Sequence, residues 1–301
     1  MSDLIKNAIP LFVIGVPRSG TTMLARLLSN HPNIVQTYET SAFLLFDNII
    51  KNAEHGYEAG ILYGKEYQTL WSKHLASVAK DVIESFYEKI FETEGRDDVR
   101  YWGDKHPHHN ACLPFIERLY PNALYIYIVR DPRDVAFSIA ENRKLSFKQA
   151  FDLWGEISKD YEKFQSSVNG DRLYRVQYEH IVKNYEEGIS QIMNWLDIEF
   201  SLAVREHIRY KQGRDFHNPE KQDTIDFAEK SMERWKARIT QEENNYALSH
   251  AVDYMIKYNY SIDTLTHPVE LNSPALELDL RDKLEPAKGW LENIFRKHST
   301  K

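Results

Sequence analysis

Near its start the chain contains an apolar segment, a glycine-containing loop and a helical pattern, and this order limits the fold more than any other feature. The segment LFVIGV, residues 11–16, is continuously apolar and rich in β-branched residues, as is typical of a buried parallel strand. The following GTTMLARLLSNHP has leucines at helical spacing and stops at Asn30, His31 and Pro32. A loop between a strand and a helix presents backbone N–H groups to an anion. We therefore predict an α/β protein that binds a phosphate-like group at this loop.

Later segments repeat the order of strand and helix. NIVQT predicts a second strand, which ends near Glu39, and ALYIYIV, residues 123–129, predicts a third. After ALYIYIV, Asp131 can cap a helix and Pro132 suits its first turn. RLYRVQYEHIV predicts a further strand, followed by a helix through EEGISQIMNWL. Strands that alternate with helices predict a mostly parallel central sheet with helices on both faces.

Two other regions read as helical. Residues 41–100 predict a helix-rich insertion that covers the sheet; its aromatic residues mainly fill helix interfaces, and a few line an acceptor pocket. These residues are Phe43, Phe46, Tyr57, Tyr63, Tyr67, Trp71, Phe86 and Tyr87. The C-terminal region from Ser201 is helical and polar. We expect one domain over residues 1–263 and a partly helical tail over 264–301, which serves a partner or dimer contact or packs on the domain.

The composition excludes some classes of protein. A net charge of -7 argues against non-specific nucleic-acid binding, which needs a basic surface. The single cysteine, Cys112, fits a reducing compartment, and its setting predicts the buried side of a helix start rather than a nucleophile. The short apolar run near the N-terminus is not a signal peptide, and no apolar run approaches the length of a membrane span. We therefore expect a cytoplasmic protein.

The loop itself departs from the nucleotide-binding pattern. Gly15 and Gly20 have the spacing of G-x-x-x-x-G-K-[ST], but Thr21 stands where the lysine should be. The backbone amides from Arg18 to Thr22 suit a phosphate, and the two threonines add hydroxyl donors. That lysine is the charge that reaches the outer phosphates of a triphosphate. The loop thus favours one phosphate with an attached anionic group over magnesium-bound ATP.

A second phosphate could bind in VRDPRDVAFS. Arg130 ends the strand, and Ser138 lies eight residues on, about two helical turns later. Because the carboxyl ends of parallel strands share an edge, both could contact the ligand held by the loop. Alternatively, Arg130 pairs with Asp131 or Asp134. Asp131 could also hold magnesium, as in nucleotide hydrolases, but the missing lysine weakens that interpretation.

GVPRSGTT and VRDPRDVAFS, in this order and each after a strand, resemble the 5′-phosphosulfate loop and the 3′-phosphate motif of the sulfotransferases. The resemblance covers residues 11–195. It implies a P-loop-type three-layer fold, 3′-phosphoadenosine-5′-phosphosulfate (PAPS) as donor, 3′-phosphoadenosine-5′-phosphate (PAP) as product, and no metal. It also implies that the 5′-phosphosulfate is surrounded by Arg18, Ser19, Gly20, Thr21 and Thr22.

The same resemblance assigns further contacts to the nucleotide. Arg130 and Ser138 would bind the 3′-phosphate, and Tyr178 in RVQYEHIV would lie near the adenine. A tyrosine that caps the strand explains Tyr178 equally well. MERWKARIT resembles a late segment of bacterial members, whose Arg234 or Lys236 could reach the 3′-phosphate, although a solvated helix face is the better interpretation.

Sulfuryl transfer to a hydroxyl needs a base, because the attacking oxygen must lose its proton. Glu39 in QTYETS is the first candidate, since it lies near the end of the second predicted strand and 21 residues after Arg18. The order PRSGTT, HP, ET is similar to that of the tyrosylprotein sulfotransferases, in which the matching glutamate is assigned as the base. A glutamate that merely caps the helix SAFLLF is the alternative.

YWGDKHPHHN contains the remaining candidates. Lys105 matches the lysine that the family holds near the phosphosulfate bridge, where a cation stabilises charge on the leaving oxygen. Cytosolic sulfotransferases of phenols and steroids use a histidine base just after a comparable lysine, so His106 or His108 is the rival of Glu39. With His109 these histidines could suggest a metal, yet no further cluster completes a set of ligands.

The sequence thus predicts in-line sulfuryl transfer from PAPS, with Glu39 as base and with Arg18 and Lys105 stabilising the leaving group. The aromatic insertion favours a small-molecule acceptor that contains a ring, through a hydroxyl or an amine. Two alternatives stay open: a P-loop kinase or nucleotide hydrolase with an unusual loop, and an inactive binding protein on the same fold. The sequence is also compatible with a homodimer.

Overall fold

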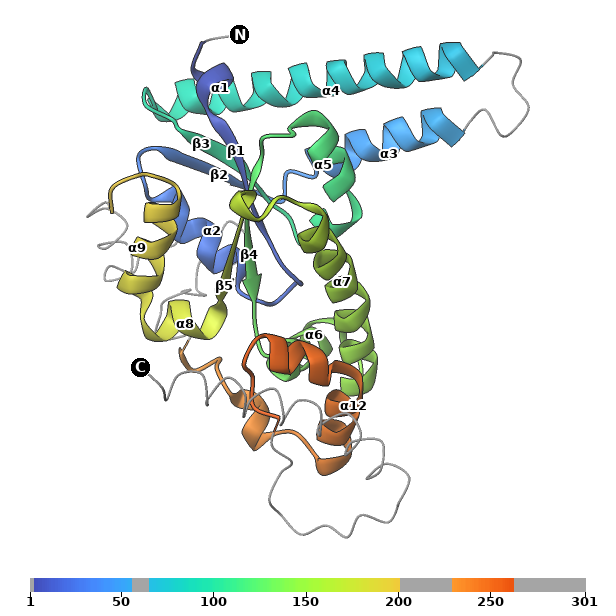
Figure 1. The fold of residues 1–301 in the computed structure, drawn as a ribbon, viewed down its shortest axis with the longest axis vertical. Helices are drawn as coiled ribbons and strands as arrows, with labels where there is room; N and C mark the ends of the chain where they lie inside the picture. The colour runs from blue at the N-terminus through green and yellow to red at the C-terminus, as the bar shows by residue number, and fades with distance from the viewer. Residues whose placement is uncertain (1–2, 56–64, 201–228, 263–301) are drawn as a thin grey trace, which may run out of the picture. The chain divides into compact units, whose positions relative to one another are not determined.

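A computed structural model describes residues 3–55, 65–200 and 229–262 of the chain (Figure 1). The predicted tail, residues 264–301, lies outside the described residues. Two compact units are formed, one within residues 1–129 and 157–230 and the other within 130–156 and 231–301. The assignment of residues 1–263 to one domain stays a prediction.

The first unit contains a five-stranded sheet in which every neighbouring pair is parallel (Figure 1). Its order is β2-β3-β1-β4-β5. The strands are β1 (Ile9–Ile14), β2 (Ile34–Tyr38), β3 (Tyr101–Lys105), β4 (Leu124–Val129) and β5 (Leu173–Gln177). The predicted parallel α/β fold is confirmed.

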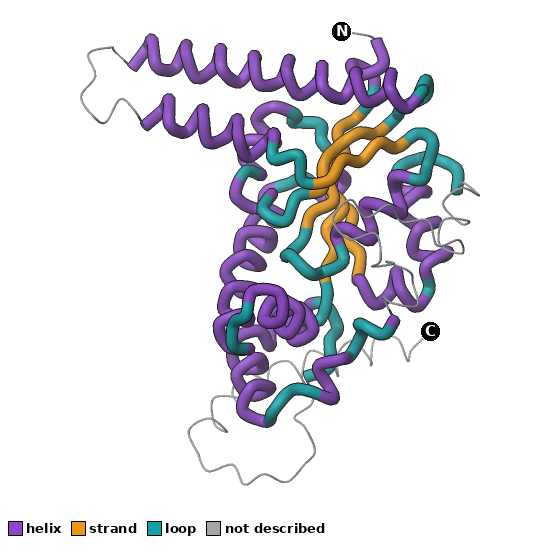
Figure 2. The backbone as a smooth tube through the Cα atoms, turned by 180° about the vertical axis from the view of Figure 1, so that it is seen from behind, coloured by secondary structure: helices purple, strands orange, loops and turns teal. Residues whose placement is uncertain are grey.

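Helices cover both sides of this sheet and give the predicted three layers (Figure 2). On one side lie α2 (Thr21–Ser29), α8 (Tyr178–Lys183) and α9 (Tyr185–Trp195). On the other side lie α5 (Leu113–Leu119) and the second half of α7 (Phe147–Ser167). The α7 helix packs on β4 through two aromatic contacts, Tyr127 with Tyr161 and Tyr125 with Phe164. A short helix, α1 (Asp3–Asn7), precedes β1.

The predicted helical insertion is confirmed by two helices that run side by side, α3 (Ala42–His55) and α4 (Lys65–Glu94) (Figures 1 and 2). Phe43 and Tyr87 are buried, and the Phe43 ring packs edge-on against Phe12 of β1. These aromatic residues therefore fill a helix interface, as expected. Trp71 and Phe86 are instead exposed.

Strand β3 was not predicted from the sequence. Its residues YWGDK include two charged side chains, yet all five are buried. Gly103 is required there, because a Cβ atom at this position would collide with the carbonyl oxygen of Leu11. The absence of a side chain lets Gln36 of β2 donate across β3 to that carbonyl, at 2.8 Å. Because a glycine and two charged residues follow Tyr101 and Trp102, the strand has no continuous apolar run that the sequence pattern could reveal.

The second unit contains α6 (Pro132–Arg143), the first half of α7, the turn η3 (Arg234–Ala237) and α12 (Gln241–Lys257). Asp131 caps α6 by accepting a hydrogen bond from the Arg133 backbone at 3.0 Å, and Pro132 is the first helical residue, as predicted. Thr240 and Glu243 cap α12 reciprocally. The 3₁₀ turns η1 (His109–Ala111) and η2 (Gly170–Arg172) belong to the first unit.

Candidate functional site

The loop between β1 and α2 has the features of an anion site. Gly20 precedes α2 in the left-handed conformation, with φ 95°, and no side chain caps the N-terminus of the helix. No acidic residue lies in its first turn, so its N–H groups and the positive end of the helix dipole are not neutralised by a carboxylate there. Ser19 and Thr21 are buried, while Arg18 is exposed. The half-buried Thr22 follows at the second helical position.

Tyr178 lies against this loop. It is buried, and its ring packs on Gly20 so closely that a Cβ atom at Gly20 would collide with it. The residue starts α8 directly after β5, so the chain places an aromatic ring beside the predicted phosphate loop. The structure therefore brings together two residues that the sequence assigned separately to the nucleotide.

Replacing Gly20 by alanine should destabilise the fold, because alanine resists a left-handed backbone and meets the Tyr178 ring. We expect a loss of at least about 1–2 kcal/mol in the free energy of unfolding from the backbone alone. Gly155 lies inside α7, and a Cβ atom added there would meet no other atom within 4 Å, so Gly155→Ala should stabilise by about 0.5–1 kcal/mol. Urea denaturation checks both; equal effects of the two substitutions would contradict the packing described.

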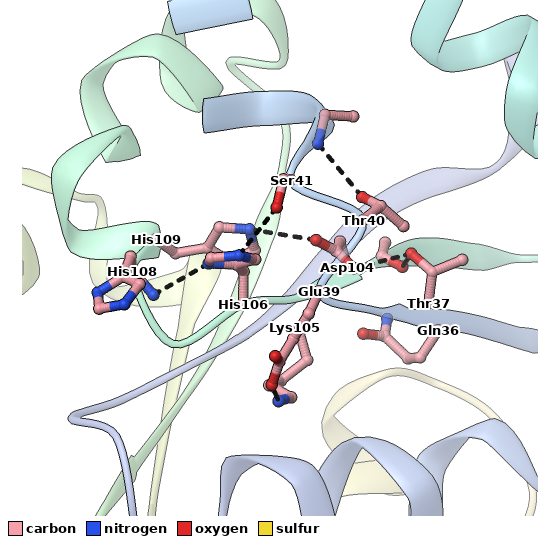
Figure 3. Close-up of polar contacts among 12 residues, drawn as sticks. Gln36, Thr37, Glu39, Thr40, Ser41, Asp104, Lys105, His106, His108 and His109 are labelled. Carbon is pink, nitrogen blue, oxygen red and sulfur yellow. Dashed lines mark hydrogen bonds and ion pairs between the residues drawn. The ribbon is translucent and has the colours of Figure 1, made fainter. Parts of the chain in front are cut away.

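The predicted base and the predicted cation form an ion pair. Lys105 Nζ lies 2.5 Å from Glu39 Oε1 (Figure 3). The contact follows from strand register: Tyr38 pairs with Lys105 in the parallel ladder, and the Glu39 N–H donates to the Lys105 carbonyl at 2.9 Å. The Lys105 side chain is 3% exposed and that of Glu39 is 50% exposed. The carboxylate can therefore meet a ligand while the ammonium is held beneath it.

The backbone after β2 is held in an uncommon conformation. Glu39 has φ 56° and Ser41 has φ 59°, both in the left-handed region. Such conformations cost of order 1 kcal/mol per residue and persist where surrounding contacts impose them. The contacts that impose it here come from Asp104 of β3.

Asp104 holds the turn at Glu39 in place through hydrogen bonds to residues on either side of it. It is fully buried and accepts a hydrogen bond from Thr37 Oγ1 at 2.9 Å and one from the Thr40 backbone. Because Thr37 uses its proton for Asp104, Tyr87, whose hydroxyl lies 2.7 Å from Thr37 Oγ1, is the donor in that contact. Burial raises the pKa of Asp104, but His109 and these hydrogen bonds outweigh it and hold the pKa below its ordinary value. Asp104 is thus an anion that positions the Glu39 turn.

Sequence reasoning missed Asp104 and Thr37 as parts of the site. Asp104 stands beside Lys105 in YWGDKHP, and Thr37 stands two residues before Glu39. Recognising β3 as a strand would have placed Asp104 opposite Thr37, since the two are paired in the parallel register. The two residues were therefore missed because β3 was not recognised as a strand, and not because of their residue types.

Asp104→Asn should lower the free energy of unfolding by about 1–3 kcal/mol, because hydrogen bonds to a buried charge are lost or weakened. Since the folded-state pKa lies below the unfolded one, this stability is present above the unfolded pKa and disappears as pH falls through the folded pKa. Urea denaturation between pH 7 and pH 3 should show the difference from the wild type shrink only at the acid end. Asp197→Asn, at a 97% exposed side chain, should stay within about 0.5 kcal/mol. A pH-independent difference would contradict the assignment.

Both ring nitrogens of His106 have polar partners. Its Nδ1 accepts a hydrogen bond from the His108 backbone at 3.1 Å, so the neutral ring carries its proton on Nε2, which lies 3.3 Å from Ser41 Oγ (Figure 3). Burial lowers the pKa of His106, and the neighbouring His109 lowers it further. Neither ring nitrogen is left to accept a proton without rearrangement.

The other two histidines have different settings. His108 is exposed, and His109 is buried with Nε2 3.6 Å from Asp104 Oδ2. Its ring also packs edge-on against Phe12 and Phe43. Within the described ranges, no group of three or more His, Cys, Asp or Glu residues is placed to hold a metal ion.

The predicted 3′-phosphate residues lie in the second unit. Arg130 is buried, donates to the Ser231 carbonyl at 2.5 Å and lies 3.9 Å from Asp134, so the alternative interpretation of an Arg130–Asp134 pair describes part of its surroundings. Ser138 is half-buried on α6, two turns after Arg130, as expected. Both residues lie in one continuous segment of the second unit, residues 130–156.

Asp131 is unavailable as a magnesium ligand of the kind found in nucleotide hydrolases. Arg133 binds both of its carboxylate oxygens, at 3.0 and 2.8 Å. This arginine is fully buried and stacks on Trp235, with its guanidinium carbon 3.4 Å from the ring centre. Asp134 accepts from the backbone N–H groups of Glu233 and Trp235. These aspartates therefore hold the second unit together.

Three further expectations concern single residues. Arg234 pairs with Glu141 at 3.1 Å and Lys236 with Glu233 at 2.9 Å, both at partly exposed positions, in agreement with a solvated surface. Cys112 is buried at the start of α5, as predicted, and burial raises the pKa of its thiol to about 12. Among the helices that the structure describes, none is long and apolar enough to cross a membrane.

Comparison with known proteins adds an independent finding. The model of the sulfotransferase family matches residues 10–201. A putative protein-tyrosine sulfotransferase of Caenorhabditis briggsae is 31% identical over 65% of this chain and 68% of that protein. The protein-tyrosine sulfotransferase of Drosophila melanogaster is 26% identical over 65% of this chain, which spans 40% of that longer protein. The sulfotransferase domain of the Synechococcus PCC 7002 olefin synthase has a TM-score of 0.60 and 20% identity, covering 85% of this chain and 97% of that domain.

Proposed function

The chain belongs to the sulfotransferase family, and from this premise we propose that it transfers the sulfuryl group of PAPS to a hydroxyl of a ring-containing acceptor. The single observation that carries the proposal is the ion pair between Lys105 and Glu39 at the carboxyl ends of β3 and β2. The loop after β1 leaves the same edge of the parallel sheet. A cation and a carboxylate at the same sheet edge as an uncapped helix N-terminus suit a reaction that needs an anion site, a base and an electrophilic group.

The donor is assigned to groups that bind without a metal. The N–H groups at the start of α2 and the hydroxyls of Thr21 and Thr22 would hold the 5′-phosphosulfate, with Arg18 adding charge. Arg130 and Ser138 would bind the 3′-phosphate, and Tyr178 would contact the adenine. The absence of the loop lysine supports this donor over ATP, because a sulfuryl group carries less charge than a phosphoryl chain.

The proposed step is an in-line displacement at sulfur. The acceptor oxygen forms a bond to sulfur while the bond from sulfur to the bridging phosphate oxygen breaks, and PAP leaves. Glu39 accepts the hydroxyl proton, and its half-exposed side chain supports this role. Lys105 and Arg18 stabilise the charge that grows on the leaving oxygen. The hydrogen bonds made by His106 support Glu39 over the histidine as base.

The acceptor is proposed to be a small molecule with a phenolic or similar hydroxyl. Tyr38, beside Glu39, is 40% exposed and supports contact with a ring. The relatives named for protein tyrosine act on a phenol as well, so a tyrosine-containing peptide is the rival acceptor, and an amine is a further one. The cytoplasmic location expected from the sequence stays a prediction.

The experiment is an assay of PAP release from PAPS with a panel of acceptors: simple phenols, aliphatic alcohols, aryl amines and a tyrosine-containing acidic peptide. The proposal expects acceptor-dependent PAP release, with mass spectrometry showing a gain of one sulfuryl group on a phenol. Transfer to the peptide alone would replace the small-molecule acceptor. No acceptor-dependent release in any class, from a protein that binds PAP, would favour an inactive binding protein.

A further inference from the structure

His109, to which the proposed reaction gives no role, lies inside the first unit at the start of η1. Its ring packs edge-on against Phe12 of β1, with 5.7 Å between the ring centres, and against Phe43 of α3, with 6.1 Å. Close packing from two separate elements leaves a buried side chain little freedom to turn. The imidazole is therefore held in one orientation.

In this orientation one nitrogen of His109 points at Asp104 (Figure 3). Nε2 lies 3.6 Å from Asp104 Oδ2, and both side chains are 1% exposed. Within the described ranges no hydrogen-bond partner is found for either ring nitrogen. A buried carboxylate needs a positive or proton-bearing group beside it, because water cannot stabilise its charge. With a proton on Nε2, the ring supplies that group in both its neutral and its charged form.

Asp104 connects this histidine to the proposed base. Its carboxylate accepts hydrogen bonds from Thr37 and from the Thr40 backbone, which lie on either side of Glu39, and it directly precedes Lys105 in β3. The backbone of Glu39, with φ 56°, is held by these contacts against its own preference. A carboxylate that moved to find another partner would therefore shift the Glu39 turn, and a displacement of about 1 Å is enough to slow catalysis strongly.

We propose that His109 is a positioning residue for the base. It stands against Asp104 Oδ2 and thereby keeps the Glu39 turn, and with it the pair of Glu39 and Lys105, in the geometry used for sulfuryl transfer. It acts through Asp104 and does not contact the acceptor or the donor. This inference rests on the proposed function, since it needs Glu39 as the base.

Two substitutions of His109 in the full chain test the role. His109→Phe keeps a ring between Phe12 and Phe43 but removes the Nε2 proton, whereas the amide of His109→Gln can still donate to Asp104. In the PAP-release assay we expect kcat to fall about 10–100-fold in His109→Phe, with the KM values for PAPS and acceptor changed less than about twofold. His109→Gln should keep most of the wild-type kcat.

Activity in the Glu39→Gln background separates positioning from a general loss of stability. If His109 acts through Glu39, adding His109→Phe to Glu39→Gln should lower the remaining kcat by less than about twofold. The matched control is Tyr101→Phe, which removes another buried hydrogen bond of β3, the one to the Leu196 carbonyl at 2.5 Å, at the other end of the strand. Tyr101→Phe should keep the wild-type kcat.

Circular dichroism and PAP titration show whether each variant is folded. If His109→Phe is not, His109→Asn takes its place, because its shorter amide corresponds to Nδ1 and does not reach Asp104. A wild-type kcat in a folded variant without the donor, or a full loss in the Glu39→Gln background, overturns the role of His109 alone. A wild type without acceptor-dependent PAP release overturns the proposed function and this role with it.

Discussion

Replacing Glu39 by glutamine is expected to reduce the rate of sulfuryl transfer by about 10²–10⁴-fold, the usual contribution of a positioned base. The substitution keeps the size of the side chain and can still accept a hydrogen bond from Lys105, so the turn held by Asp104 should persist. PAP binding should therefore change little while kcat falls. Steady-state kinetics with the acceptor found in the PAP-release assay measures the effect.

The matched control is Glu242→Gln. Glu242 also pairs with a lysine, Lys148, at 2.6 Å, but on the surface of the second unit. Loss of that exposed pair should leave turnover unchanged. If Glu39→Gln retained the wild-type kcat, another group would have to accept the proton, and rearrangement of His106 would become the alternative to test.

Replacing Lys105 by methionine is expected to lower kcat by about 10²–10³-fold, because a preorganised charge next to the leaving oxygen is removed. Methionine is nearly the same length as lysine, which limits the cavity left at this buried position. PAP should still bind through the loop and the 3′-phosphate residues. Kinetics and PAP titration of the same preparation separate the two effects.

The surface lysine Lys148 supplies the control, and Lys148→Met should have normal turnover. A double-mutant cycle with Glu39→Gln adds a sharper test. Because the two side chains are 2.5 Å apart, their effects on kcat should be clearly non-additive. Fully additive losses, or full activity of Lys105→Met, would contradict a shared role in the reaction.

The strands formed by continuous apolar runs could be predicted from the sequence. LFVIGV and ALYIYIV became β1 and β4, and the glycine loop between β1 and α2 lies where the spacing of Gly15 and Gly20 indicated. Strand β3 was missed because Asp104 and Lys105 interrupt its apolar character. Their charges are compensated within the fold, by Thr37 and Glu39, and such pairing is not visible in a linear sequence.

The candidate site, too, could be predicted only in part from the sequence. Motif order singled out Glu39 and Lys105 separately, but only strand register brings them to 2.5 Å from each other. The hydrogen bonds of His106, which weaken it as a base, depend on a backbone turn that residue types do not specify. Asp104 needed the strand to be known before its position under the Glu39 turn could be inferred.

Calorimetric titration of the full chain with PAP, repeated with magnesium-bound ATP as competitor, tests whether PAPS is the donor. We expect tight binding of PAP that is indifferent to magnesium, weakened by Ser138→Ala and lost in Arg130→Ala, with no displacement by ATP. Absence of PAP binding by the folded protein, or a preference for magnesium-bound ATP, would rule out PAPS as the donor and support a nucleotide-dependent kinase or hydrolase instead.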